Sequence, residues 1–335
     1  MQKVFTVFSF RPFFHLPLGE EICYNTYMKT IFPERKTSLF KQLSPTQASG
    51  LAYSLSIAFS ILSVFLFIIA IGALGLIQEG YSEKDWYLYC AFLLPQLCFG
   101  VLTFLYVKNN KFEAKELVKL PKPHYFLVAI VLQIGLLSLG ELNSWFLEIL
   151  KGVGYESEGI AVPSLDGFGY FGVLFVIAVL PAIFEEIFFR GILLKGLKGF
   201  GEVSAILICG ALFSLYHKNP AQTAYQFVCG VAFALVAIRS GSILPTIVSH
   251  FLNNALIITM TKFGWSLDPI YVPFLGVSIL CLISSVTYLL FFDKKLQDTP
   301  QKEEQEKDYK GFFLFASVGI AVCALTWLTN LFKGM

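Results

Sequence analysis

The chain has 335 residues, of which 56% are hydrophobic and 14% are charged, and its formal net charge is +2. Soluble domains carry about 25% charged residues, so this composition excludes a soluble globular protein as well as disordered, collagen-like and disulfide-scaffold classes. The near-neutral charge gives no support to a nucleic-acid partner. We therefore expect an all-α, polytopic membrane protein that has the lipid bilayer as its environment.

Nine apolar segments approach the length of about 20 residues that a spanning helix needs. They cover residues 51–77, 86–107, 125–140, 169–194, 202–217, 222–238, 243–260, 270–292 and 311–332. The runs at 125–140, 202–217 and 222–238 are short, so one of them could be re-entrant, which would leave eight spans. The expected fold is a transmembrane helical bundle of about nine spans.

Four regions are expected along the chain. Residues 1–50 show no cleavable signal peptide and are interpreted as a cytoplasmic or interfacial N-terminal segment. Residues 51–150 form the first three transmembrane helices, and residues 151–262 form the core that carries the polar intramembrane residues. Residues 263–335 hold the C-terminal helices and a charged linker at 293–310. The seven Cys residues form no CxxC pair and are interpreted as small hydrophobic residues.

The distribution of basic residues predicts how the chain crosses the membrane. With nine spans in strict alternation, 19 of the 25 Lys and Arg residues fall on one side and 5 on the other, while Arg190 lies within a span. Because cytoplasmic loops are rich in Lys and Arg, the N-terminus is expected in the cytoplasm and the C-terminus outside. The excess of Lys over Arg and the 35 Phe residues indicate an AT-rich genome. We expect a multi-pass protein of the bacterial inner membrane.

Ionisable residues inside spans are candidates for function because they are costly in hydrocarbon. The segment 169–194 contains Glu185, Glu186 and Arg190. Glu186 and Arg190 are four residues apart and share one helix face, so an ion pair that only positions the helix is the simplest interpretation. For Glu185, the structural alternative is a protonated carboxyl group that is hydrogen-bonded inside the bundle.

Two of the four His residues also lie in or at the end of apolar segments. His217 ends the fifth segment, and His250 lies in the seventh with Asn254 four residues later. Taken alone, His217 could cap a helix, and the pair His250 and Asn254 could hold helices together by hydrogen bonds. All of these polar groups fall within one stretch of 70 residues, which favours a shared site.

Glutamate, two histidines and an asparagine amide suit peptide hydrolysis without a covalent intermediate. A glutamate near a histidine can deprotonate a water molecule, while a second histidine and an amide can donate hydrogen bonds to the developing oxyanion. Other intramembrane protease types fit less well. The sequence contains no HExxH motif, no Asp within a predicted span, and no His after Ser278, the one serine of a GxS motif within a span.

Three short motifs resemble those of a known family. FEEIFFRG at 184–191 is similar to an EExxxR motif, FSLYH at 213–217 to FxxxH, and HFLNN at 250–254 to HxxxN. In this order and within apolar runs, they resemble the CAAX protease and bacteriocin-processing (CPBP, or Abi) family of glutamate-type intramembrane proteases. The resemblance covers about residues 169–260.

The resemblance implies a role for each of these residues. Glu185 would be the water-activating base with His217 as its partner, His250 and Asn254 would stabilise the oxyanion, and Glu186 with Arg190 would support the site. Members of this family are often described as metalloproteases, and Glu185, His217 and His250 would then be zinc ligands. The missing i,i+4 His pair of metalloprotease helices favours a mechanism without a cofactor.

The resemblance also implies the class of substrate, namely prenylated CAAX tails or bacterial leader and pheromone peptides that associate with the membrane. Two other functions remain open from the sequence. A proton- or ion-coupled transporter could use the same residues as a relay, although it would predict inverted repeats, which are not evident. A non-catalytic immunity or binding protein could keep the fold without turnover.

Overall fold

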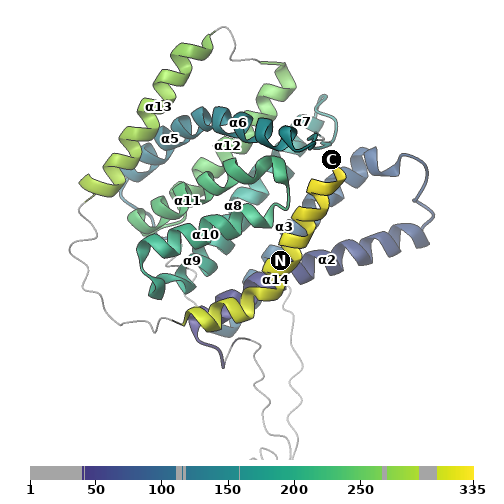
Figure 1. Cartoon of the computed structure of the whole chain (residues 1–335). Coiled ribbons are helices and arrows are strands. Elements are labelled where there is room, and N and C mark those ends of the chain that lie inside the picture. The colour runs from purple at the N-terminus through teal and green to yellow at the C-terminus, as the bar shows by residue number, and fades with distance from the viewer. Residues whose placement is uncertain are drawn as a thin grey trace, which may run out of the picture.

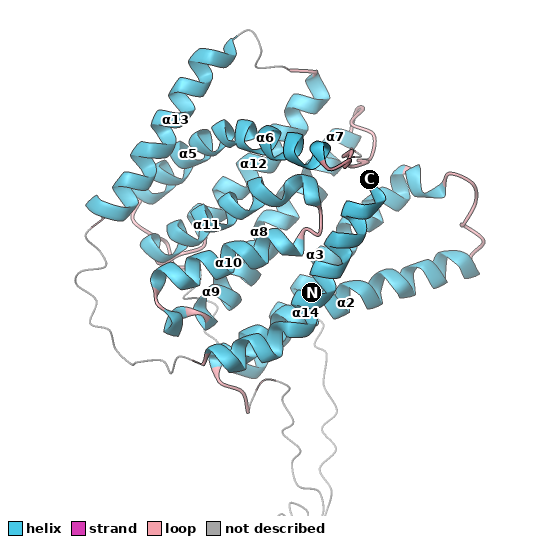
Figure 2. Ribbon diagram, in the orientation of Figure 1, coloured by secondary structure: helices cyan, strands magenta, loops and turns pink. Residues whose placement is uncertain are grey.

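A computed structural model of the chain describes residues 40, 42–110, 115, 118–157, 159–265, 270–293 and 308–335. Within these residues the chain is helical and contains no strand (Figures 1 and 2). Residues 1–39 and most of the linker 293–310 lie outside the described residues, and so do the predictions made for them.

Each of the nine predicted apolar segments coincides with a helical segment of the described chain. The first four are α2 (Pro45–Ala73), α3 (Asp85–Asn110), α5 (His124–Leu136) continuing through Leu137–Leu139 into α6 (Gly140–Gly152), and a helix over residues 169–196. The other five are α10 (Glu202–Tyr216), α11 (Thr223–Ser240), α12 (Leu244–Phe263), α13 (Tyr271–Thr287) with its extension Tyr288–Phe292, and α14 (Tyr309–Lys333).

Seven of these helical segments are long and apolar enough to cross a membrane. The exceptions are α10, which is shorter, and α12, which contains the polar residues of the HFLNN motif. The prediction of an all-α polytopic bundle is confirmed, and the protein is an integral membrane protein.

Two helices extend beyond the apolar segments that predicted them. α2 begins at Pro45 rather than at residue 51, because a capping box stabilises its first turn. The Ser44 hydroxyl accepts from the backbone N–H of Gln47, and the Gln47 side-chain carbonyl accepts from the backbone N–H of Ser44. The third segment was predicted to end at 140, but a 3₁₀ turn connects it to α6, which ends at Gly152. Charged residues on α6, among them Glu148 and Lys151, hid this extension from a search for apolar runs.

The helix ends gather at two opposite ends of the bundle. At one end, Thr46 donates to the carbonyl of Gly196, Tyr309 donates to that of Phe200, and Arg239 pairs with Glu202. We call this the basic end. The start of α2 and the described connections 195–201 and 239–243 lie there, and Tyr125 at the start of α5 donates to Asp293, which follows the extension of α13. The segments of the predicted topology that are rich in Lys and Arg adjoin these helix ends.

The other helix ends meet at what we call the cavity end. There Asp85 accepts from the backbone N–H of Ser164, Lys262 pairs with Asp166, and Asn330 donates to the carbonyl of Lys218. The described connections 74–84, 153–157, 159–168 and 217–222 belong to this end, and so does the end of α12. Successive helices therefore run in alternate directions through all nine segments, as the predicted topology requires.

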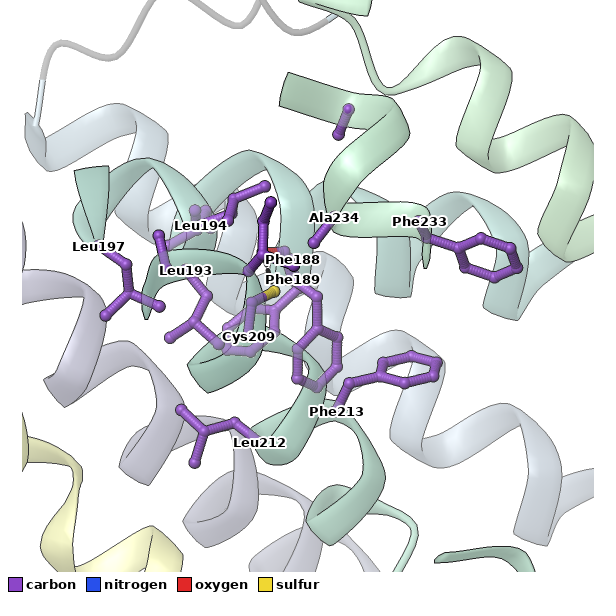
Figure 3. Close-up of a cluster of buried hydrophobic side chains, with 14 of the residues drawn as sticks. Phe188, Phe189, Leu193, Leu194, Leu197, Cys209, Leu212, Phe213, Phe233 and Ala234 are labelled. Carbon is purple, nitrogen blue, oxygen red and sulfur yellow. Dashed lines mark hydrogen bonds between the residues drawn. The ribbon is translucent and has the colours of Figure 1, made fainter. Parts of the chain in front are cut away.

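The half of the bundle toward the basic end is a close-packed apolar core (Figure 3). Side chains within and after the EExxxR motif pack there against α10 and α11. The labelled members of this cluster are Phe188, Phe189, Leu193, Leu194, Leu197, Cys209, Leu212, Phe213, Phe233 and Ala234. Helices α10 and α11 approach closely because Gly210 faces Gly230, where an added Cβ would lie 2.8 Å from the Gly210 Cα.

Candidate active site

The EExxxR motif lies in the middle of the helix over residues 169–196, which contains two π-helical stretches. This helix consists of α7 (Gly169–Val173), a π-helical stretch Leu174–Val179, α8 (Leu180–Glu186), a second π-helical stretch Ile187–Leu193 and α9 (Leu194–Gly196). Such wide turns are frequent at functional sites because they redirect side chains and expose backbone carbonyls. Glu185 and Glu186 occupy the short α-helical part between them.

Glu186 connects the helix over residues 169–196 to α12. Its Oε1 accepts from Arg190 Nη1 at 2.7 Å and lies 2.9 Å from His250 Nδ1, and the Glu186 side chain is fully buried. Because an ionised carboxylate can only accept, Nδ1 of His250 must carry the proton of this bond. Glu186 therefore fixes the orientation of the His250 ring and leaves its Nε2 free to face other groups.

Arg190 is held from three directions, although it is almost fully buried. Besides Glu186, its Nη2 donates to the backbone carbonyl of Gly230 on α11 at 3.1 Å. Its guanidinium carbon lies 4.5 Å from the centre of the Phe213 ring and 5.3 Å from that of Phe233. Cation–π contacts of this kind stabilise a desolvated charge, so the buried ion pair is well supported.

Glu185 faces away from that ion pair and toward a cavity. Its Oε1 accepts from Gln96 Nε2 of α3 at 3.1 Å, and its Oε2 lies 4.0 Å from His250 Nε2. The second distance is too long for a direct hydrogen bond and suits two groups that share one water molecule. Glu185 and Glu186 thus have separate partners, although they are adjacent in the sequence.

His217 follows the last residue of α10, and a hydrogen bond to the backbone of the same helix orients its ring. Nδ1 lies 2.8 Å from the backbone carbonyl of Phe213, which can only accept, so Nδ1 carries the proton and Nε2 remains available. The next residue, Lys218, has a φ of 54°, and its carbonyl accepts from Asn330 of α14. This left-handed residue ends α10 at His217 and turns the chain toward α11.

Asn254 is positioned by a backbone carbonyl of the helix over residues 169–196 that has no donor four residues later. Pro181 has no N–H to donate to the carbonyl of Ile177 four residues earlier, and Asn254 Nδ2 donates to that carbonyl at 2.9 Å. Asn254 Oδ1 accepts from Asn253, whose own Oδ1 accepts from Tyr225 at 2.6 Å and from a glutamine of α5. One hydrogen of the Asn254 amide is left for another acceptor.

A single cavity of about 1220 Å³ contains the predicted site residues. Glu185, His217, His250 and Asn254 all line it, and they come from the helix over residues 169–196, from α10 and from α12. Within the described residues no hydrogen bond joins Glu185 to His217. Glu186 and Arg190 lie behind the cavity wall, as expected for residues that support a site. The individual roles of these residues stay predictions.

The sequence reasoning missed two buried polar residues that contact the site. Gln96 donates to Glu185, and Gln133 donates to Asn253, yet neither was named as a candidate. Both are glutamines inside predicted spans, so a search for every polar residue in apolar runs, charged or not, would have found them. Both lie on helices that precede the three motifs.

The described residues do not form a metal site. Nε2 of His217 and Nε2 of His250 are both unprotonated in the neutral ring, as in metal-binding histidines. However, no group of three His, Cys, Asp or Glu side chains in the described part of the chain lies close enough to hold a metal ion. Three protein ligands are the usual number at a catalytic zinc site, so the arrangement does not fit zinc.

Comparisons with known proteins agree with the motifs. Residues 167–256 match the family model of the Rce1-like type II CAAX prenyl endopeptidases. This range contains Glu185, Glu186, Arg190, His217, His250 and Asn254 and ends two residues after the last of them. No curated protein and no solved structure matches the chain.

Proposed function

We infer that the chain is a membrane peptidase of the CAAX protease and bacteriocin-processing family, and we propose that it hydrolyses peptide bonds within the bilayer by means of Glu185. The observation that carries this proposal is the convergence of Glu185, His217, His250 and Asn254 on one cavity that lies against a sealed apolar core. The bacterial inner membrane is the proposed location.

In the proposed reaction, Glu185 acts as the general base. A water molecule between Glu185 Oε2 and His250 Nε2 gives one proton to Glu185 while its oxygen attacks the carbonyl carbon of the peptide. Protonated Glu185 then passes this proton to the amide nitrogen, the C–N bond breaks, and a carboxylic acid and an amine are formed. The unprotonated Nε2 of His217 accepts a hydrogen bond from the same water or from protonated Glu185.

The oxyanion requires hydrogen-bond donors, and the tautomers limit which groups can supply them. Asn254 has one amide hydrogen that is not used by Ile177. His250 can donate from Nε2 only as an imidazolium, which takes a second proton from solvent before water attacks, because its first proton lies on Nδ1 beside Glu186. Glu186 is paired with Arg190 and can stabilise this imidazolium, so the buried ion pair assists the reaction through His250.

The substrate is proposed to be a membrane-associated peptide or protein. The cavity walls are largely apolar, with Ile61, Val64 and Phe65 of α2 on one side and Ile257 and Ile258 of α12 on the other. An apolar segment of the substrate can lie between these walls while its peptide bond reaches Glu185. Prenylated CAAX tails and leader or pheromone peptides both have this chemistry.

A comparison of peptides in cells tests the proposal. Cells that lack the protein are complemented with the wild type or with Glu185→Gln, and their membrane peptides and protein termini are identified by mass spectrometry. We expect at least one peptide that is cleaved only with the wild type and accumulates uncleaved with the variant. Equal sets of termini in the two strains, with equal amounts of both proteins in the membrane, would contradict a peptidase that uses Glu185.

A further inference from the structure

The cavity that contains the site opens in one direction along the bundle. Its polar floor is formed by Gln96, Glu185 and His250 near the middle of their helices. From there the lining residues continue toward the cavity end, through Ile68 of α2 and Thr261 of α12 to Lys218, Ile160, Val162 and Leu165 of the connections at that end.

The opposite direction is closed by the apolar core. Four apolar side chains follow the two glutamates along the helix toward the basic end, and all of them are fully buried: Phe188, Phe189, Leu193 and Leu197. The buried guanidinium group of Arg190 lies against the rings of Phe213 and Phe233. These buried side chains occupy the space between the site and the basic end, so the described core leaves no route for a peptide from that end.

The charge distribution identifies the side of the membrane that each end faces. Together with the adjoining helix ends and residues 1–50, the segments on the side of the basic end contain 19 of the 25 Lys and Arg residues of the chain. The connections and helix ends on the side of the cavity end contain five, namely Lys84, Lys151, Lys218, Lys262 and Lys333. The alternation of helix directions in the structure groups the connections in the same two sets. By the positive-inside rule, the basic end faces the cytoplasm.

The sides of the cavity indicate how a substrate enters. Phe65 of α2 is 60% exposed and Ile257 of α12 is 51% exposed, although both line the cavity, so its apolar walls continue to the outer surface of the helices. In a membrane that surface contacts lipid. The mouth also contains polar groups, among them Asn143, Lys218 and Gln226, which suit a hydrated part of a peptide.

From the cavity, the core and the charges we infer that this protein accepts its substrate from the non-cytoplasmic side of the membrane. The substrate class is a peptide with an apolar anchor in the outer leaflet and a polar part outside the cell, such as a peptide that has already been translocated. A peptide whose polar tail lies in the cytoplasm does not fit, so of the two substrate classes proposed above this inference favours leader or pheromone peptides that have crossed the membrane. This inference rests on the proposed function for the substrate, but the direction of access does not depend on catalysis.

Thiol labelling in intact cells tests the direction of access. In a chain whose native Cys residues are replaced, Ser60→Cys is placed at the cavity floor, Thr261→Cys at the mouth and Lys198→Cys at the basic end. Ser60 is buried and lines the cavity, and Thr261 and Lys198 are exposed. The probe is a small, charged methanethiosulfonate that does not cross the membrane.

We expect Ser60→Cys and Thr261→Cys to react in intact cells and Lys198→Cys to react only in inverted vesicles. Reaction of Ser60→Cys only from the cytoplasmic side, or from neither side, would overturn the inference. If Ser60→Cys reacts from outside the cell but the wild type cleaves no peptide, only the proposed function is contradicted. If the wild type cleaves peptides but Ser60→Cys reacts only from the cytoplasmic side, only the direction of access is contradicted.

The substrate class is tested by the position of the cleaved bonds. Among peptides that accumulate with Glu185→Gln, we expect the bonds cut by the wild type to lie on the non-cytoplasmic side of an apolar anchor. Cleavage confined to cytoplasmic tails would overturn the assignment of the substrate class, whatever the labelling shows.

Discussion

The matched region, residues 167–256, and the helices that flank it contribute to the site in different ways. The matched region supplies each side chain that the motifs predicted, from Glu185 to Asn254. The flanking helices supply contacts that hold those side chains, through Gln96 of α3, Gln133 of α5 and Asn330 of α14. In this chain the reactive groups and part of their support therefore come from separate parts of the sequence.

This difference predicts two kinds of mutational effect. Substitutions of the motif side chains in the matched region should remove the chemistry or the folded state. Substitutions of the flanking contacts should leave a folded protein that reacts more slowly, because they change the position of groups that remain present. The predictions below test this division, beginning with the largest expected effect.

Glu185→Gln should lower the rate of proteolysis by at least about 10²–10⁴-fold, the usual contribution of a general base. Glutamine keeps the volume and the bond from Gln96 but cannot accept a proton, so the thermal stability in detergent should hardly change. The measurement is the rate on a peptide identified in cells, with the exposed Glu148→Gln as a matched control. Near wild-type cleavage by Glu185→Gln would contradict the proposed role.

Arg190→Ala should reduce the amount of folded protein as well as the rate. It leaves Glu186 as a fully buried carboxylate without its cation, and breaking a buried pair costs about 3–5 kcal/mol. The control is Arg239→Ala, whose partner Glu202 keeps 30% of its side chain exposed to solvent and can be hydrated. If both variants show equal yields and melting temperatures, the pair is not structural.

Gln96→Leu should lower kcat about 10-fold or more with little change in KM, since a hydrogen bond to a charged group contributes about 1.5–3 kcal/mol. The matched control is Gln226→Leu, which removes an amide from the cavity wall that is not bonded to Glu185. In a Glu185→Gln background the substitution should have no further effect on the residual rate. An additive loss there would mean that Gln96 acts independently of Glu185.

Gln96 is an example of a site contact that the sequence could not predict. Hydropathy located all nine helices because each apolar run must be buried in lipid or protein, and the motifs located Glu185, His217, His250 and Asn254 because ionisable and amide groups are rare in such runs. The contact between Gln96 and Glu185 spans 89 positions. Only the packing of α3 against α8 creates it, and no periodic pattern within one helix encodes such a pairing.

The same limit applies to hydrogen-bond direction. The spacing of Glu186 and Arg190 predicted their ion pair, since four residues bring both to one helix face. It could not predict that Glu186 also bonds His250 Nδ1, which decides the tautomer of the ring. That bond depends on the depth of α12 relative to α8, which is a property of the whole bundle.

Asn330→Ala should have a smaller effect, about fivefold on the rate, because it removes one neutral hydrogen bond of about 1 kcal/mol. Asn330 donates to the carbonyl of Lys218 and so holds the left-handed turn that ends α10 at His217. The control on the same helix is Thr329→Ala, whose hydroxyl bonds only within α14. Equal rates for the two variants would show that α14 does not position His217.

Removal of metal should have no effect on the rate. The two free imidazole nitrogens and the Glu185 carboxylate are ligand types that zinc accepts, and a catalytic zinc would normally bind three of them. In the described residues these side chains do not form such a group, and Glu185 Oε2 is 4.0 Å from His250 Nε2. We therefore expect full activity of the purified protein after dialysis against EDTA, and no stoichiometric zinc by elemental analysis.

Loss of activity that added zinc restores would make Glu185, His217 and His250 ligands. The matched region would then bring them together around the metal, and Gln96 would orient a ligand instead of a base.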